Sequence, residues 1–357
     1  MRIFLALLLL LCLAACSSDT KSIPYASGRS GDMYVIMDSA QWQGPLGRTI
    51  DSLFSAEMPG LPRKEKIFHM RWIDPRKLNF VLKQRRTLMF VMTLDQTGEG
   101  ARIVRRLFTP ASIEKIKNEP DQFNQKTKDL FARDQEVVFL YGKNEHTLLK
   151  NIRAHGSRLV GYFDQKERER LTKSLFKAGQ VKGISQALVR DLHCEIKVPF
   201  GFKLAEKSKD FIWLRQINPK DDRDIFIARK PYTSQMDFSR ENLIRFRDDI
   251  CREHLFEDPD EPNSYLLTET TIPFIPITAD TVTFNHHFAI QLRGLWRTNT
   301  LGMGGPFLGY AMVDEKAQLL YYIEGFTFSP GRDQREIMRE LETILYTFKT
   351  STDLGKK

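Results

Sequence analysis

Serine and histidine come close together at two points of this chain, where a nucleophile and its base would be sought first. GISQA (183–187) departs from the G-x-S-x-G nucleophile turn because Ala187 replaces the second Gly. HGSR (155–158) places a His two residues before a Ser in sequence of helical character, where residues i and i+2 do not face each other. Neither stretch predicts an activated serine, so no catalytic residue is assigned from a local motif.

Cysteine and histidine also have spacings that are relevant to metal binding. Cys251 and His254 are three residues apart, which would place them on one face of a helix, and His193-Cys194 would complete a Cys₂His₂ set. However, adjacent residues of a strand point to opposite faces of the sheet, so His193 and Cys194 are poorly placed to bind one ion. We therefore predict no metal site. Cys194 and Cys251 are expected either to form a disulfide or to pack as small apolar residues.

The glycine-rich stretch GMGGPF (302–307) is not a phosphate-binding loop, because no Lys-Ser/Thr follows it. It is expected to form a broad hairpin in which Gly supplies positive φ and Pro306 stiffens the exit. An exposed aromatic residue beside Arg and Asn suits a sugar, a peptide or the edge of a protein. The candidate contact residues on or beside this loop are Arg293, Trp296, Arg297, Asn299 and Tyr310.

The N-terminal stretch LLLLLCLAACSSD (7–19) indicates a targeting signal. Its apolar run (4–13) is about half the roughly twenty residues that a membrane-spanning helix needs, and it has the length of a secretory signal. The residues LAAC (13–16) resemble the lipobox of bacterial lipoproteins. This resemblance implies cleavage before Cys16, a diacylglyceryl group on its thiol and acylation of the new amine. The alternative is an ordinary secretory signal with a chance Cys.

Composition and charge indicate folded material whose two halves differ. Hydrophobic residues make up 41% of the chain and aromatic residues 11%, which excludes a disordered protein. Residues 19–180 contain 29 Lys and Arg against 19 Asp and Glu, whereas residues 181–357 contain 24 against 26. The basic half would be attracted to anionic headgroups or an acidic polymer, unless its charges form an ordinary solvated face. No nucleic-acid-binding motif accompanies it.

The first half alternates strand and helix patterns. A flexible, lipidated linker (16–31) is expected to precede a basic α/β domain (32–178), while residues 1–15 form the signal peptide. The β-α-β-β-α-β order of the elements, followed by a helix, predicts a ferredoxin-like arrangement. The expected strands are 32–38, 66–74, 87–95 and 135–142, and the expected helices are 45–57, 98–119 and 144–176.

The second half reads as an antiparallel meander. A domain over 184–350 is expected to consist of an antiparallel sheet covered by two helices, at 239–256 and after Pro330, followed by a tail (351–357). Ser239 is the predicted N-cap of the first helix. The overall fold class is therefore α+β. The expected strands are 193–202, 210–217, 224–232, 264–272, 286–299, 307–314 and 317–328.

Two family resemblances follow from these motifs. VPFGF, RGLW leading into GGPF, LLYYIEGFTFSP and the terminal helix are similar to the α/β/α sandwich of the PsbP and Mog type, which implies a mostly non-catalytic binding fold over 193–349. Residues 16–350 also resemble an uncharacterised bacterial lipoprotein family, through the lipobox, GDMYVIMD, RGLWRTNTLGMGGPF and YYIEGF. That resemblance implies a location and an architecture but no activity.

Three hypotheses of function remain. The first is a lipid-anchored, non-catalytic binding or assembly protein of the cell envelope, in the outer membrane rather than the inner, with an envelope protein or glycan as partner and no cofactor. The absence of Asp after Cys16, judged by resemblance to enterobacterial lipoproteins, favours the outer membrane. The second is an envelope hydrolase whose site forms only in the fold, from His155, His286 or His287 and carboxylates. The third is a protein that docks on membranes or glycolipids through its basic half.

Overall fold

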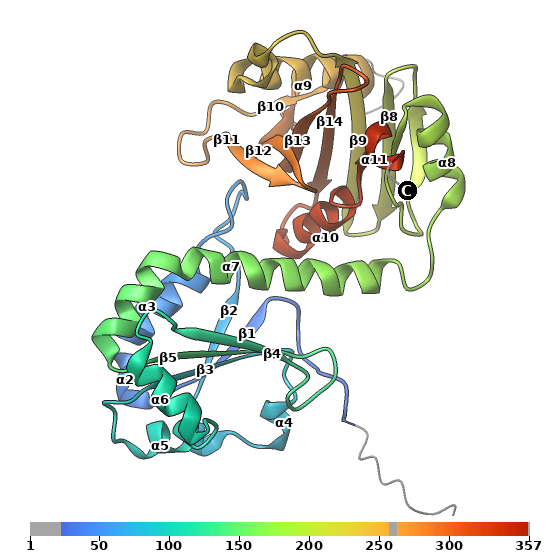
Figure 1. Cartoon of the computed structure of the whole chain (residues 1–357). Coiled ribbons are helices and arrows are strands. Elements are labelled where there is room, and N and C mark those ends of the chain that lie inside the picture. The colour runs from blue at the N-terminus through green and yellow to red at the C-terminus, as the bar shows by residue number, and fades with distance from the viewer. Residues whose placement is uncertain (1–22, 257–262, 356–357) are drawn as a thin grey trace, which may run out of the picture. The chain divides into compact units, whose positions relative to one another are not determined.

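The computed structural model describes residues 23–256 and 263–355, which form two compact units (Figure 1). Unit 1 comprises the described residues up to Arg48 together with Met70–Ile152, and unit 2 comprises Thr49–His69 and the residues from Arg153 onward. Cys16, the predicted lipid attachment residue, lies outside the described residues. Each unit thus draws on two separate stretches of the chain.

Unit 1 is built on a five-stranded sheet of order β2-β1-β3-β5-β4. Its strands are β1 (Asp32–Ile36), β2 (His69–Ile73), β3 (Thr87–Thr93), β4 (Asn124–Lys128) and β5 (Glu136–Gly142). Its helices are α2 (Ser39–Gln43), α4 (Phe80–Lys83), α5 (Glu99–Arg105) and α6 (Pro110–Asn118), with a 3₁₀ helix at Pro75–Lys77. Helices α3 (Pro45–Phe54) and α7 (Glu145–Leu175) begin in unit 1 and end in unit 2.

The strand directions in unit 1 differ from the expected ferredoxin-like arrangement, in which neighbouring strands are antiparallel. Instead β1, β3 and β5 run parallel, and β4 pairs antiparallel with β5. All residues of β1 and β3 are buried. Strands that are buried along their whole length are typical of parallel sheets, because the helices that connect parallel strands cover both faces of the sheet.

Unit 2 is built on an antiparallel sheet of order β10-β12-β13-β14-β9-β8-β7, with β11 also paired to β12. Its strands are β7 (Lys203–Lys207), β8 (Phe211–Asn218), β9 (Asp221–Pro231), β10 (Leu266–Thr268), β11 (Thr278–Phe284), β12 (His287–Thr298), β13 (Gly304–Asp314) and β14 (Leu319–Phe328); a small separate ladder joins β6 (Cys194–Glu195) and β15 (Lys349–Thr350). Its other elements are α8 (Lys182–Asp191), the 3₁₀ helix Gln235–Phe238, α9 (Arg240–His254), α10 (Arg335–Leu345) and α11 (Ser351–Leu354).

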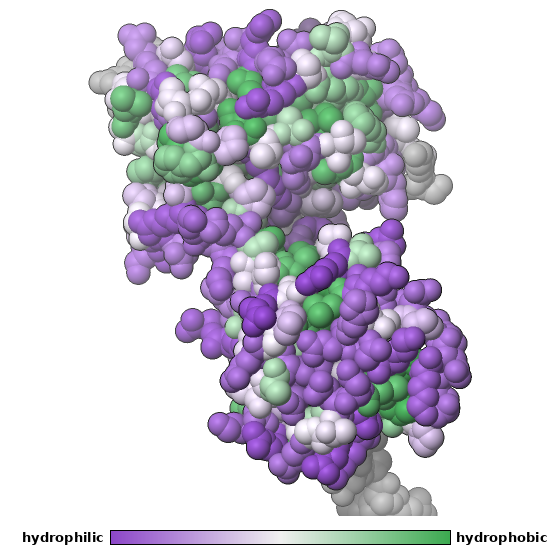
Figure 2. Space-filling model, turned by 90° about the vertical axis from the view of Figure 1, so that its left-hand side faces the viewer, coloured by the Kyte–Doolittle hydropathy of each residue, from purple (hydrophilic) through white to green (hydrophobic). Residues whose placement is uncertain are grey.

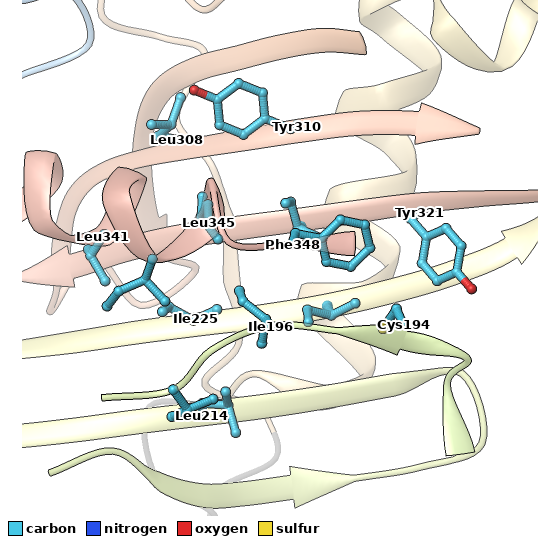
Figure 3. Packing of buried hydrophobic residues seen from close by; sticks show 14 of the residues in the cluster. Cys194, Ile196, Leu214, Ile225, Leu308, Tyr310, Tyr321, Leu341, Leu345 and Phe348 are labelled. Carbon is cyan, nitrogen blue, oxygen red and sulfur yellow. The ribbon is translucent and has the colours of Figure 1, made fainter. Parts of the chain in front are cut away.

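The large sheet separates two hydrophobic clusters. One face packs against α10 and α8, and Figure 3 shows part of this cluster, in which Leu341 and Leu345 of α10 lie over Ile225 of β9. The other face packs against α9, whose Leu243 and Ile250 belong to the second cluster. Alternate side chains of each strand therefore enter different cores, because successive strand residues point to opposite faces.

The α+β class and the helix-covered antiparallel sheet are confirmed. On the face drawn in Figure 2, hydrophobic residues are interspersed among hydrophilic ones. Within residues 23–256 and 263–355, none of the helices combines the length and apolarity required to span a bilayer.

Candidate functional site

The two aromatic residues of the predicted contact loop lie in the core. Trp296 is 2% exposed, and its Nε1 donates to the carbonyl oxygen of Thr327 at 3.2 Å. Tyr310 is fully buried, and its hydroxyl donates to Glu342 Oε1 at 2.7 Å. The expectation of an exposed aromatic contact is therefore wrong. The reason is that β12 and β13 are interior strands, which direct Trp296 toward the α9 face and Tyr310 toward the α10 face.

The three polar residues of that prediction are engaged with other parts of unit 2. Arg293 Nη2 lies 2.8 Å from Glu342 Oε1, so the structure brings Arg293 and Tyr310 together on one carboxylate. Arg297 pairs instead with Glu269 at 3.0 Å, and Asn299 Nδ2 donates to the carbonyl oxygen of Asn263 at 2.7 Å. The five residues do not form one site.

Glycines near this loop serve close packing, which also differs from the expectation. The residue with positive φ in the hairpin is Leu301 (62°), while Gly305 and Gly309 lie within β13. A Cβ on Gly305 would approach the Thr327 carbonyl oxygen to 2.1 Å, and a Cβ on Gly309 would approach the Tyr322 hydroxyl to 2.3 Å. Only glycine fits at such distances, so the close approach of the neighbouring strand explains why glycine occupies both positions.

Cys194 and Cys251 are free thiols, so the first of the two expected outcomes, a disulfide between them, is not present in the structure. Cys194 belongs to the hydrophobic cluster on the α10 side of the sheet and Cys251 to the cluster on the α9 side. Burial raises the pKa of each thiol to about 12, which keeps both protonated at neutral pH. They act as small apolar residues, the second of the two expected outcomes.

The serine of GISQA also has a structural partner. Ser185 lies on α8, is buried, and donates its hydroxyl hydrogen to the carbonyl oxygen of Ile196 at 2.8 Å. Among residues 23–256 and 263–355, no group of three His, Cys, Asp or Glu side chains has a geometry that would hold a metal ion.

The feature that stands out in unit 2 is a pocket of about 840 Å³. A volume in this range is typical of ligand sites. Three aromatic rings, two imidazoles and several polar groups surround it. The lining residues are Tyr232, Gln235, Phe238, His286, His287, Phe288, Val313, Asp314, Glu315, Lys316, Thr350 and Thr352.

The turn between β11 and β12 forms part of the wall. Asn285 and His286 both have positive φ, 47° and 72°, as the two central residues of a type I′ turn require. Asn285 also has a structural role, since its Nδ2 donates to the carbonyl oxygens of Tyr346 and Phe348. His286 is exposed, and at its position Gly would fit with less strain. A non-glycine residue in this conformation beside a pocket is a candidate for binding.

Hydrogen bonds engage two carboxylates at the pocket: Asp314 of the lining, and Asp353, which is the partner of the lining residue His287. Asp314 accepts from Ser351 Oγ at 2.6 Å and from both the backbone N–H and the hydroxyl of Thr352, at 3.0 and 2.6 Å. His287 Nε2 lies 2.9 Å from Asp353 Oδ1. Burial raises the pKa of both carboxyl groups, but these donors outweigh it, so each pKa lies below its usual range. Both groups stay ionised at neutral pH.

Three aromatic rings belong to the lining of the pocket. Tyr232 and Phe238 have ring centroids 6.0 Å apart, and Phe238 meets Phe288 edge to face at 5.3 Å. Phe288 is 57% exposed, although a large apolar side chain would ordinarily be covered. The rings therefore offer an apolar surface to a molecule that enters the pocket.

This arrangement brings Ser, His and Asp together without forming a catalytic triad. A triad requires the serine hydroxyl to bond the imidazole, which is in turn oriented by the carboxylate. Here Ser351 bonds Asp314, and His287 bonds Asp353. His155, which the hydrolase hypothesis also named, lies on α7 outside the pocket lining. The arrangement is suited to binding.

Sequence reasoning missed this pocket because its residues come from four separate segments of unit 2. One signal was available: the alternating run TADTVTF ends directly before Asn285, and Asn followed by one residue between two strand patterns indicates a two-residue hairpin. That reading would have placed His286 in a turn and His287 at the start of the next strand.

Comparisons with known proteins supply two family matches but no activity. Residues 26–176 match the model of a family described as a domain of unknown function (DUF8532), and residues 182–347 match another described as a domain of unknown function (DUF4837). No curated protein matches the chain.

Solved structures similar to part of the chain include the Ran-binding protein Mog1p of Saccharomyces cerevisiae. It is 10% identical with a TM-score of 0.31, and the match covers 46% of this chain and 92% of that one. A variant of protein Mog1 is similar at 9% identity with a TM-score of 0.29, over 44% of this chain and 91% of that one. The two halves of the chain are therefore similar to two families of unknown function.

Proposed function

We propose that the protein is a lipid-anchored, non-catalytic binding protein of the bacterial cell envelope. The support for the location is LAAC (13–16), preceded by a short apolar run and followed at once by polar residues. In this proposal residues 1–15 are removed and Cys16 carries the acyl chains. The membrane that holds them is the outer membrane rather than the inner. Several chains buried together give a stable anchor without a transmembrane helix.

The pocket beside His286 is the proposed binding site. The observation that carries this choice is a contrast between its groups: the Asp314 and Asp353 carboxylates are hydrogen-bonded within the protein, whereas the Phe288 ring is exposed. An enzyme needs reactive groups that are free to exchange protons, while a binding site needs an apolar surface with a few polar groups for orientation.

A polypeptide segment of another envelope protein is the ligand class that fits best. The carboxylate of Asp314 is occupied by protein donors and so is not available to the hydroxyls of a sugar. What remains open is the aromatic surface around Phe288 with Gln235, Glu315 and Lys316 beside it, a mixture of apolar surface and both charges. This combination matches a peptide with one large apolar side chain.

The anchor is tested by growing cells with an alkyne-bearing palmitate and comparing two cysteine variants. Cys16→Ser should lose the label, whereas Cys12→Ser, four residues away, should keep it. Equal labelling of the two variants would overturn the anchor.

The pocket is tested by placing a photo-crosslinking phenylalanine analogue at position 288 and, as a matched control, at Ile217. Ile217 is 69% exposed but lies on β8, outside the pocket lining. In intact cells, position 288 should give one discrete protein adduct that position 217 does not give, and His286→Gly should reduce its yield. An adduct with a glycan would show that the ligand is a sugar and not a polypeptide. Equal yields of adduct at positions 288 and 217 would refute the site.

A further inference from the structure

Three segments of unit 1 are joined into one surface, here called the docking face, which comprises residues 23–27, 79–86 and 129–135. Gln135 connects two of them, because its Nε2 donates to the carbonyl oxygens of Lys83 and Arg85 at 2.6 and 2.7 Å while its Oε1 accepts from the Phe131 N–H. The N-terminal segment is held by short backbone bonds: Ala26 N to Arg133 O at 2.8 Å and Ser27 N to Gln84 O at 2.9 Å. These bonds fix the first described residues of the chain beside α4 (Figure 1).

Large apolar side chains are exposed on this face. Five of the six exposed large hydrophobic residues described in unit 1 belong to it, and the sixth is Leu107. Phe80 is 73% exposed and Val81 57%, as consecutive residues of α4. The five are Ile23, Tyr25, Phe80, Val81 and Leu130. Such a group marks an interaction surface, since isolated exposed apolar residues are ordinary but a cluster of them is not.

The local structure explains why Phe80 and Val81 are held outward. Asn79 caps α4 by accepting from the Leu82 N–H at 3.0 Å, and Leu82 packs against the core of unit 1. One turn of helix cannot direct three consecutive residues inward, so anchoring Leu82 leaves the two residues before it in solvent. The fold thus presents an apolar pair at the tip of a capped turn.

Cations are interspersed with these apolar residues. Lys83 Nζ lies 5.5 Å from the ring centre of Phe131, and the Arg133 guanidinium lies 5.5 Å from that of Tyr25. The basic residues of the face are Lys83, Arg85, Arg86 and Arg133, and its acidic residues are Asp129 and Asp134. Apolar side chains surrounded by a basic excess match the interface of an anionic bilayer, where the rings enter the headgroup layer and the cations meet lipid phosphates.

The length of the chain brings this face to the membrane if Cys16 carries the lipid, a premise that rests on the proposed function. Ile23 lies seven positions after Cys16, and an extended chain spans at most about 3.6 Å per position. The attachment point is therefore within about 25 Å of the docking face. Tethering at this distance makes contact with the bilayer effectively intramolecular.

We propose that the docking face lies on the anionic surface of the membrane that holds the lipid anchor, with Phe80 and Val81 inserted among the headgroups. The anchor fixes the protein in the membrane, and the docking face fixes the orientation of unit 1 on it. The partner is the lipid bilayer itself, recognised by its negative charge and its apolar interior.

The test uses the full lipidated chain in vesicles of phosphatidylcholine with 30% phosphatidylglycerol, labelled with a polarity-sensitive fluorophore through Val81→Cys. Leu107→Cys is the matched control, an exposed apolar position of unit 1 outside the docking face. Both native thiols are buried and will not compete for the label. Emission at position 81 should shift to shorter wavelength and be quenched by lipids that carry a quencher, whereas position 107 should respond to an aqueous quencher.

A second measurement separates the docking face from the anchor. Full-length Cys16→Ser protein, which has no lipid, should partition onto the same vesicles, and a further Phe80→Ser/Val81→Ser change should weaken partitioning about tenfold, which corresponds to 1.4 kcal/mol. Lipidated protein that floats with vesicles while position 81 stays aqueous would refute the docking face and leave the anchor intact. Failure of the native protein to float would overturn both.

Discussion

Two buried glutamates on opposite faces of the unit 2 sheet show how the number of neighbouring cations decides the state of a buried acid. Glu324 on the α9 face receives a bidentate contact from Arg247, with both N–O distances at 2.8 Å, and the hydroxyl of Tyr322 at 2.6 Å. Glu342 on the α10 face accepts hydrogen bonds from Arg293 Nη2 at 2.8 Å and from the Tyr310 hydroxyl at 2.7 Å. Both glutamates are almost fully buried.

Their pKa values move in opposite directions. Burial raises the pKa of Glu324, and its one close arginine does not reverse that effect. Burial acts on Glu342 in the same sense, but Arg293, Arg168, the Tyr310 hydroxyl and Arg339 together outweigh it and leave its pKa below the usual range. A buried carboxylate with several neighbouring cations should therefore remain stabilised when one of them is removed, whereas a carboxylate with a single cationic partner should not.

The largest effect expected from this difference is that of Arg247→Met. It leaves Glu324 without its counter-charge in a dry core, which should lower the free energy of unfolding by about 3–5 kcal/mol. Chemical denaturation measures it. The double variant Arg247→Met/Glu324→Leu, which removes both charges, should recover much of the loss. A double variant no more stable than Arg247→Met would contradict the account.

A pH-dependent effect of up to about 4 kcal/mol is expected from Asp224, which lies at the end of the same face. Burial raises its pKa to about 7, although Arg215 and the Trp213 N–H act in the opposite sense. Because the folded state keeps the proton between pH 4 and 7 while the unfolded state releases it, this group lowers stability as pH rises through that window, by about 1.4 kcal/mol per unit. Asp224→Asn should remove this slope.

The comparison for Asp224 is between unfolding free energies of the wild type and of Asp224→Asn at pH 5 and pH 8. The variant should gain stability relative to the wild type at the higher pH. A difference between the two proteins that is the same at both pH values would show that Asp224 is already ionised in the folded protein at pH 5.

Arg293→Met on the α10 face should lower the free energy of unfolding by a smaller amount, about 2 kcal/mol. Glu342 keeps Arg168, whose Nη1 lies 4.0 Å from its Oε2, and Arg339 nearby, so the carboxylate is not left without a cation. The measurement is the same denaturation series. A loss equal to that of Arg247→Met would show that the additional arginines do not compensate, and the proposed contrast between the two faces would fail.

These residues also show how far sequence reasoning reaches in this protein. Local signals were read correctly: Ser239 was predicted as an N-cap, and its side chain accepts from the Asn242 N–H at the start of α9. The direction of Trp296 and Tyr310 was not, because which face a strand side chain enters depends on pairing with strands far away in sequence. Partners such as Glu324 lie 77 residues from Arg247. No periodicity carries that information, and the pocket, assembled from four segments, was missed for the same reason.

The finest distinction between the two faces is that between their tyrosines. Tyr322→Phe removes the hydroxyl that donates to Glu324, and Tyr310→Phe removes the matching donor of Glu342, without changing charge or leaving a large cavity. Since Glu324 has one close cation, loss of a donor should cost about 2 kcal/mol there and about 1 kcal/mol at Glu342. Because the two substitutions are chemically identical, the difference between them isolates the electrostatic surroundings of each carboxylate. A larger loss for Tyr310→Phe would mean that hydrogen-bond geometry, and not the number of arginines, governs how a buried glutamate is stabilised in this sheet.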